Sequence, residues 1–215
     1  MDRGQAQRFL IAEGVSAFPR VVTHIYDPRR GPFQNLCSVP TAEAQAVLDQ
    51  IAATGQRRIK PNYLARRQAT EAWLWAERTR KIGPVRRDHP IYFFLGDFAD
   101  GKDPSRPESI LLALDELPPE SITFTYSDSM TSFALGTKVE HRAERRAFHG
   151  QVFTLDEIEA VVARHGMPEK APDATRARRA HGYIELQLWD ERPLERCLTE
   201  RHPLSLATGR GRLAG

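Results

Sequence analysis

The apolar residues of this chain come in short runs, and this limits the folds that are open to it. The longest runs, such as residues 91–95 and 110–114, hold about five residues, whereas a membrane-spanning helix needs about 20. Short runs that are bounded by Gly, Pro and Asp are typical of strands in a buried sheet. We therefore expect a globular protein without a membrane segment.

Five segments are predicted to be strands, because they are rich in β-branched and aromatic residues and are bounded by turn-forming residues. In the last segment Tyr183, Glu185 and Gln187 alternate with aliphatic residues. One face of this strand is therefore predicted to be polar and aromatic and to carry a carboxylate. The predicted strands are residues 20–26, 91–95, 109–114, 121–125 and 182–189.

Three segments carry the three- and four-residue spacing of apolar side chains that predicts a helix. Thr41 is predicted to cap the first, the second is rich in arginine, and a capping box of Thr154 and Glu157 opens the third. The predicted helices are residues 41–54, 62–81 and 155–165. With the strands, they predict an α+β protein whose mostly antiparallel, twisted sheet is flanked by helices.

The chain has 215 residues, of which 40% are hydrophobic, and this is enough to bury one sizeable core. We expect a single domain over residues 1–204 and a flexible C-terminal tail over residues 205–215. Residues 167–178 lack periodicity and are predicted to form a loop.

Two features predict a cytoplasmic protein. The first residues lack the apolar block of a secretory signal. Cys37 and Cys197 are far apart in the sequence, with no further cysteine at metal-binding spacing, which is typical of unpaired thiols in a reducing compartment.

The net charge is only +3, but many of the arginines occur as adjacent pairs. Pairs that converge on one face would attract phosphate groups, whereas dispersed pairs would only solvate their helices. Both interpretations stay open at this stage. The pairs are Arg29-Arg30, Arg57-Arg58, Arg66-Arg67, Arg86-Arg87, Arg145-Arg146 and Arg178-Arg179.

Motifs for phosphate-loop hydrolysis, Rossmann redox chemistry, serine hydrolysis and thiolate zinc sites are absent from the sequence. What remains is a pattern over three predicted strands: His24 on the first, Tyr92 with Phe93 on the next, and Glu185 on the last. In this order, His, Tyr and Glu resemble the H-Y-E type of ADP-ribosyltransferase. The segments Ile-Tyr-Phe-Phe, Ile-Thr-Phe-Thr-Tyr-Ser-Asp and Glu-Leu-Gln-Leu-Trp-Asp-Glu-Arg-Pro-Leu resemble the DNA-targeting toxins of that class, the DarT family, over about 170 residues.

The resemblance implies a split sheet with a cleft that binds NAD as substrate. Glu185 would be the catalytic residue, while His24, Tyr92 and Phe93 would contact NAD. The toxins carry an arginine shortly after their Tyr-Phe strand, a place where this chain has no basic residue before Lys102. Arg66 or Arg67, on the arginine-rich predicted helix, is expected to take its place. The implied partners are a nucleic acid, single-stranded DNA or RNA, and an antitoxin protein.

The chemistry of NAD cleavage explains these residue types. Breaking the bond between nicotinamide and ribose develops positive charge on the ribose, which a carboxylate such as Glu185 stabilises and orients. A neutral imidazole can bond a ribose hydroxyl, and an aromatic ring can stack on nicotinamide; His24 and Tyr92 are the candidates for these contacts.

Two other functions remain open from the sequence. Asp115 and Glu185, with Gln187, could hold Mg²⁺ in a metal-dependent nuclease. Alternatively, the chain could be a nucleic-acid-binding or protein-binding module that kept the fold and the arginine pairs without the chemistry.

Overall fold

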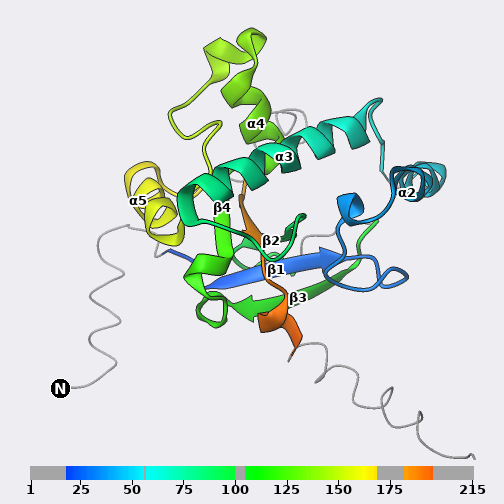
Figure 1. The fold of residues 1–215 in the computed structure, drawn as a ribbon, viewed down its shortest axis with the longest axis horizontal. Helices are drawn as coiled ribbons and strands as arrows, with labels where there is room; N and C mark the ends of the chain where they lie inside the picture. Colours follow the sequence, from blue (N-terminus) through cyan, green and yellow to red (C-terminus); the bar gives the residue numbers. More distant parts are fainter. Residues whose placement is uncertain (1–17, 56, 100–104, 169–181, 196–215) are drawn as a thin grey trace, which may run out of the picture.

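The computed structural model describes residues 18–55, 57–99, 105–168 and 182–195. They form one five-stranded sheet in which every strand pair is antiparallel, together with four α-helices (Figure 1). The mixture of helices and strands and the mostly antiparallel sheet that were expected from the sequence are thus confirmed. The strands are β1 (Val21–Tyr26), β2 (Ile91–Leu95), β3 (Glu108–Ala113), β4 (Ile122–Tyr126) and β5 (Ile184–Leu188), and the helices are α2 (Thr41–Ala53), α3 (Tyr63–Ile82), α4 (Ser129–Thr137) and α5 (Leu155–His165).

The strand order is β3-β1-β2-β5-β4, so strands that follow one another in the sequence are mostly not neighbours in the sheet. β1 pairs with β3 along its whole length, but it pairs with β2 only at Val22–Leu95 and Thr23–Phe94. Beyond Thr23 the β1–β2 ladder ends. There a side chain links the two strands: His24 Nδ1 lies 2.9 Å from the backbone oxygen of Tyr92. The two central strands therefore diverge at one end.

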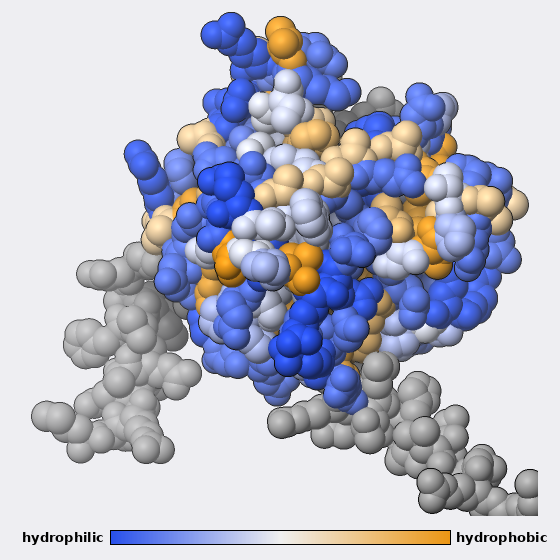
Figure 2. All heavy atoms as spheres, in the orientation of Figure 1, coloured by the Kyte–Doolittle hydropathy of each residue, from blue (hydrophilic) through white to orange (hydrophobic). Residues whose placement is uncertain are grey.

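Both faces of the sheet are covered. The main apolar core lies on one face and includes Phe93, Phe124 and Leu186, with Ile158 and Val162 of α5 packed against them. α3 crosses the other face (Figure 1), where its Leu74 joins a cluster with Val152 and Trp189. As a result, every residue of β5 is buried, including Glu185 and Gln187. The view in Figure 2 shows a mostly hydrophilic surface with small, separate apolar patches.

Several element boundaries differ from the prediction by one or two residues. Thr41 is the first residue of α2, and Pro40, which has no side chain able to bond the helix, stands at the N-cap. α3 begins after Asn62, which has a left-handed backbone (φ 60). Ser121 belongs to a 3₁₀ turn, Pro119–Ser121, before β4. The capping box of Thr154 and Glu157 on α5 is confirmed. Most of the predicted loop 167–178 and all of the predicted tail 205–215 lie outside the described residues.

Sequence patterns did not predict α4. Its sequence, SMTSFALGT, is rich in Ser, Thr and Gly, which favour helices weakly. Tertiary contacts hold it in place instead: the Asp128 side chain caps its first turn by accepting from the Thr131 N–H, and α4 packs on β4 and α3. Near its C-terminal end, Gly136 lies against the backbone of Gly150. None of the helices in the described part of the chain is long and apolar enough to span a membrane.

The close approach of Gly136 to Gly150 leads to a prediction for Gly136→Ala. A Cβ at position 136 would lie 2.2 Å from the Gly150 Cα, so the backbone of α4 must shift. We expect unfolding free energy to fall by about 1–3 kcal/mol in urea denaturation followed by circular dichroism. Thr137→Ala, at an exposed position on the same helix, is the control and should change little. Equal stability of the two variants would contradict the packing described here.

Candidate functional site

A cavity of about 730 Å³ opens where β1 and β2 diverge. Its size is within the range of small-molecule sites, and its walls come from β1, β2, β5, α2, α3 and the start of α4. The structure brings all the site residues predicted from the sequence to this one cavity: His24, Arg66, Arg67, Tyr92, Phe93 and Glu185.

Glu185 is a buried carboxylate with few partners. One of its oxygens accepts from the Ser129 N–H at 3.3 Å and from Gln187 Nε2 at 3.2 Å. The first donor belongs to the N-terminal turn of α4, where the helix dipole favours negative charge. Burial nevertheless raises the pKa of Glu185; Arg67 opposes this shift and the Asp128 carboxylate adds to it. A buried, weakly compensated carboxylate of this kind is typical of functional sites.

The turn that leads into this helix is strained at Ser127, two residues before α4 begins. Ser127 has a left-handed backbone (φ 70) although it is not glycine, and its carbonyl accepts from the Thr125 hydroxyl at 3.0 Å. The strained turn directs the start of α4 toward β5, so the Ser129 N–H reaches Glu185. Strain of about 1–3 kcal/mol that the surrounding structure maintains is common at functional sites.

Arg67 lies opposite, on α3. Its guanidinium carbon is 3.8 Å from the centre of the Tyr92 ring, and its Nε donates to Glu71 at 3.0 Å. Its side chain is only 14% exposed. Because Arg67 acts electrostatically on both Glu185 and Tyr92, it supplies a fixed positive charge between the two predicted site residues.

Glu71 holds this arrangement, and sequence analysis did not single it out. Its carboxylate is 1% exposed and takes four donors. Oε1 accepts from Asn35 Nδ2 at 3.1 Å, from Arg67 Nε at 3.0 Å and from the Tyr92 hydroxyl at 3.0 Å, and Oε2 lies 2.7 Å from His89 Nδ1. In the sequence, a glutamate in an arginine-rich helix indicates an ordinary ion pair on the surface. Only the tertiary structure shows that the Glu71 carboxylate is buried.

His24 uses both ring nitrogens within the chain. Nε2 accepts from the Phe33 N–H at 2.9 Å, so Nδ1 carries the proton and donates to the Tyr92 carbonyl. Burial lowers its pKa to about 4, which keeps the ring neutral. In this state no ring nitrogen is left for a ribose hydroxyl. What the contacts give His24 is a positioning role: it joins β1, β2 and the loop after β1.

The two remaining predicted residues differ in exposure. Phe93 is 1% exposed and packs against His24 and Phe33 in the main core, so it contributes mainly an apolar wall. Arg66 is exposed at the cavity, in contrast to Arg67 beside it. The two arginines that were interchangeable in sequence analysis are therefore distinct: one is anchored, and the other faces solvent.

Among the cavity residues that were not predicted as site residues are Arg106, Asp128 and Tyr183. Tyr183 packs edge-on against Phe94, with ring centres 4.6 Å apart, and Asp128 is the cap of α4. In the sequence, Asp128 is the last residue of the segment Ile-Thr-Phe-Thr-Tyr-Ser-Asp that resembles the toxins, but no pattern singled it out as a site residue. Arg106 acts electrostatically on His24 and Tyr183, so a basic residue after β2 does reach the cavity, beyond Lys102.

Cationic side chains from three of the arginine pairs converge on the cavity. Arg57 lies over the Tyr63 ring at 5.6 Å, and Arg30 bonds Asp27 and Gln50. This convergence favours the phosphate-attracting interpretation of the pairs. Apart from Arg67 and Arg106, the cations that line the cavity are Arg30, Arg57, Arg58, Lys60 and Arg66.

The two carboxylates of the nuclease hypothesis, Asp115 and Glu185, are not brought together. Asp115 is exposed and pairs with Arg20, and it is not among the described residues that line the cavity. Gln187 is fully buried and bonds Thr123 and Thr125 instead of presenting its amide to a metal. The structure thus gives no carboxylate pair from these residues.

No protein-family model, curated protein or solved structure matches the chain.

Glu71→Gln tests whether one carboxylate holds the site. The amide removes the charge beside the buried Arg67 and turns an N–H₂ toward groups that are themselves donors. Breaking a buried ion pair in this way costs about 3–5 kcal/mol, so urea denaturation should show a loss of that order. Glu77→Gln is the matched control, because Glu77 is on the same helix and pairs with the exposed Arg80; its cost should be below about 0.5 kcal/mol. If the two variants lose the same stability, Glu71 does not anchor the site.

Proposed function

We propose that this protein is an ADP-ribosyltransferase-like enzyme that cleaves NAD and transfers ADP-ribose to a nucleic-acid base, with DNA as the preferred acceptor. The observation that carries the proposal is the convergence of Glu185, Arg67 and Tyr92 from two strands and a helix on one cavity. The sequence order His24, Tyr92, Glu185, which resembles the H-Y-E enzymes, supports it independently.

The early end of the β1–β2 ladder also supports this proposal. A sheet whose neighbouring strands β1 and β2 separate gives a bound dinucleotide access to side chains of both halves. His24 holds the open end by its two hydrogen bonds. In the proposed enzyme it shapes the NAD site through the backbone that it fixes, and it contacts the ribose only if one of these bonds is exchanged.

In the proposed reaction the bond between the ribose C1′ and the nicotinamide nitrogen breaks, and its electron pair leaves with nicotinamide. An acceptor nitrogen or oxygen then bonds C1′ and releases a proton. Glu185 stabilises the positive charge on the ribose between these two events. Its charge is effective there because burial excludes water and the Ser129 and Gln187 donors fix the carboxylate before reaction.

The cations around the cavity are proposed to hold the phosphates. Arg67 is preorganised by Glu71 and Tyr92, so binding a phosphate would cost it little side-chain entropy. Arg57, Arg58 and Lys60 lie in the part of the wall that follows α2, where they can take either the NAD pyrophosphate or the backbone of a nucleic acid.

The same cations favour a second candidate, a nucleic-acid-binding module without catalysis, because they do not depend on Glu185. The two functions separate in one experiment. Nicotinamide release is measured with single-stranded DNA, RNA or protein as acceptor, at low salt and with a chelator present. Release with attachment of ADP-ribose to DNA supports the enzyme. Nucleic-acid binding without NAD binding or nicotinamide release would contradict the proposed enzyme and would support the binding module instead.

Glu185→Gln is predicted to lower nicotinamide release by about 10²- to 10³-fold and to leave NAD affinity nearly unchanged. The amide oxygen can still accept from Ser129 and Gln187, so the geometry is kept and only the charge is lost. Stopped assays of release, with calorimetry for NAD binding, give the two quantities. Unchanged release by the variant would remove Glu185 from the mechanism.

The raised pKa of Glu185 adds a pH signature. Ionising a buried carboxylate costs folding energy once the pH exceeds its ordinary pKa of 4.5. Relative to the wild type, Glu185→Gln should therefore gain stability as pH rises from that value through the raised pKa. The acid limb of activity should fall at a pH above 4.5, because the reaction needs the ionised form. Thermal unfolding of the wild type and Glu185→Gln over pH 4–8 checks the predicted gain in stability. A stability difference between the two proteins that is constant with pH would contradict it.

A further inference from the structure

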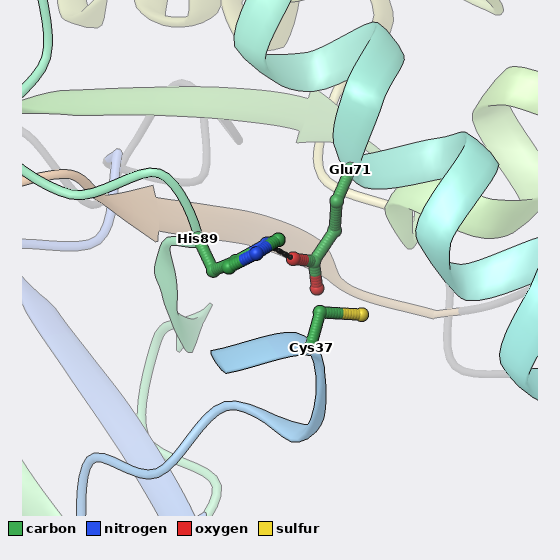
Figure 3. A group of neighbouring side chains, drawn as sticks. All are labelled: Cys37, Glu71 and His89. Atoms are coloured by element: carbon green, nitrogen blue, oxygen red, sulfur yellow. Dashed lines mark hydrogen bonds and ion pairs between the residues drawn. The ribbon is translucent and has the colours of Figure 1, made fainter. Parts of the chain in front are cut away.

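Cys37, Glu71 and His89 come from three segments that are far apart in the sequence, and their side chains lie together (Figure 3). Glu71 also bonds Arg67 and Tyr92 of the cavity wall. Cys37 belongs to the 3₁₀ turn η1 (Leu36–Ser38), Glu71 to α3, and His89 to the segment before β2. The Cys37 sulfur, a Glu71 oxygen and a His89 ring nitrogen all lie within 4.8 Å of one another. It is the only such group of three among the described residues.

We propose that these three side chains form a binding site for one zinc ion, separate from the chemistry of Glu185. A thiolate, an imidazole and a carboxylate are the ligands that Zn²⁺ prefers in proteins, and three of them leave a fourth, tetrahedral position for water.

The geometry requires only side-chain adjustment. With metal–ligand bonds of about 2.0–2.3 Å, neighbouring ligand atoms in a tetrahedral site are about 3.4 Å apart. The contact of 2.7 Å between His89 Nδ1 and Glu71 Oε2 must open slightly, and the Cys37 sulfur must move closer. The ion replaces the proton that the His89–Glu71 hydrogen bond now holds, and it also releases the thiol proton.

The two oxygens of Glu71 are already divided in a way that suits this site. Oε1 is used by Asn35, Arg67 and Tyr92, whereas Oε2 is used by His89. A metal on Oε2 therefore leaves the anchor of the cavity in place. The positive charge of Arg67 opposes binding of a cation, and the thiolate charge that forms on Cys37 offsets it.

Asn35 gives the three ligands a common support. It is 6% exposed, and its Oδ1 accepts from the Cys37 N–H at 2.7 Å. Its Nδ2 donates to Glu71 Oε1 at 3.1 Å and to the carbonyl of Pro90, the residue next to His89. One buried side chain thus fixes all three ligand-bearing segments, as outer-shell residues do in zinc sites. Cys37 and His89 are only partly buried, which gives an ion a path from solvent.

Substitution of a cobalt ion tests the site on the full chain. Co²⁺ should bind one-to-one and give the near-ultraviolet absorption of a cobalt–thiolate bond, and Zn²⁺ should abolish this signal by competition. Cys37→Ser should remove the thiolate band, and His89→Gln should weaken binding by at least about tenfold, the effect of losing an outer-shell partner being 10- to 100-fold. Cys197→Ser, at the only other cysteine of the chain, is the matched control and should bind as the wild type does.

A second measurement does not depend on the folding of the ligand variants. In Cys197→Ser, Cys37 is the only thiol, and Zn²⁺ should slow its alkylation by iodoacetamide at least about tenfold, as followed by mass spectrometry. Full binding by Cys37→Ser and His89→Gln, or alkylation of Cys37 that Zn²⁺ does not change, would overturn the proposal. Magnesium should have no effect, because thiolate and imidazole are poor ligands for it.

Discussion

The buried ion pair between Glu71 and Arg67 is the interaction on which the rest of the site depends. Removing two charges from water is costly, and the cost is offset only when every remaining hydrogen-bonding group is satisfied. Glu71 meets this condition with Asn35, Tyr92 and His89 as further donors. Arg67 donates its Nε–H to Glu71, and its guanidinium lies over the Tyr92 ring. Three segments are locked by this one carboxylate: the turn after β1, the middle of α3 and the start of β2.

Glu185 is placed in the opposite way. It has two weak donors, a like charge nearby and a cation that is already paired with another carboxylate. Glu71, whose carboxylate accepts four hydrogen bonds, therefore has a structural role. Glu185, whose carboxylate accepts two, is the one proposed to act in the reaction. The strained Ser127 and α4, which sequence patterns did not predict, belong to the same arrangement, because together they direct the Ser129 N–H toward Glu185. The strain at Ser127 lowers the free energy of unfolding, and packing elsewhere, including the contact of Gly136 with Gly150, offsets this loss.

The sequence contained enough information for the strands, three helices and part of the set of residues that meet at the cavity. Strands such as β2 are short apolar runs with turn residues on both sides, and α5 carries its own capping box, so local rules suffice for them. Local rules fail for α4, whose helix is imposed by neighbours, and for the strand order, which depends on pairing over long distances. Glu71 and Asn35 were missed because burial of a polar residue is a tertiary property. The sequence also could not show whether His24 binds a ligand or positions the backbone, because that depends on tertiary hydrogen bonds to both of its ring nitrogens.

The most direct test of this account is a double-mutant cycle on Arg67→Met and Glu71→Gln, with unfolding free energy measured by urea denaturation. If the pair anchors the site, each single variant leaves an unmatched buried group, and the double variant is more stable than the sum of the two losses predicts. A coupling of about 2 kcal/mol is expected, within the range for contacting residues. Additive losses within about 0.5 kcal/mol would show that the two residues act independently, and the site would then need a different anchor.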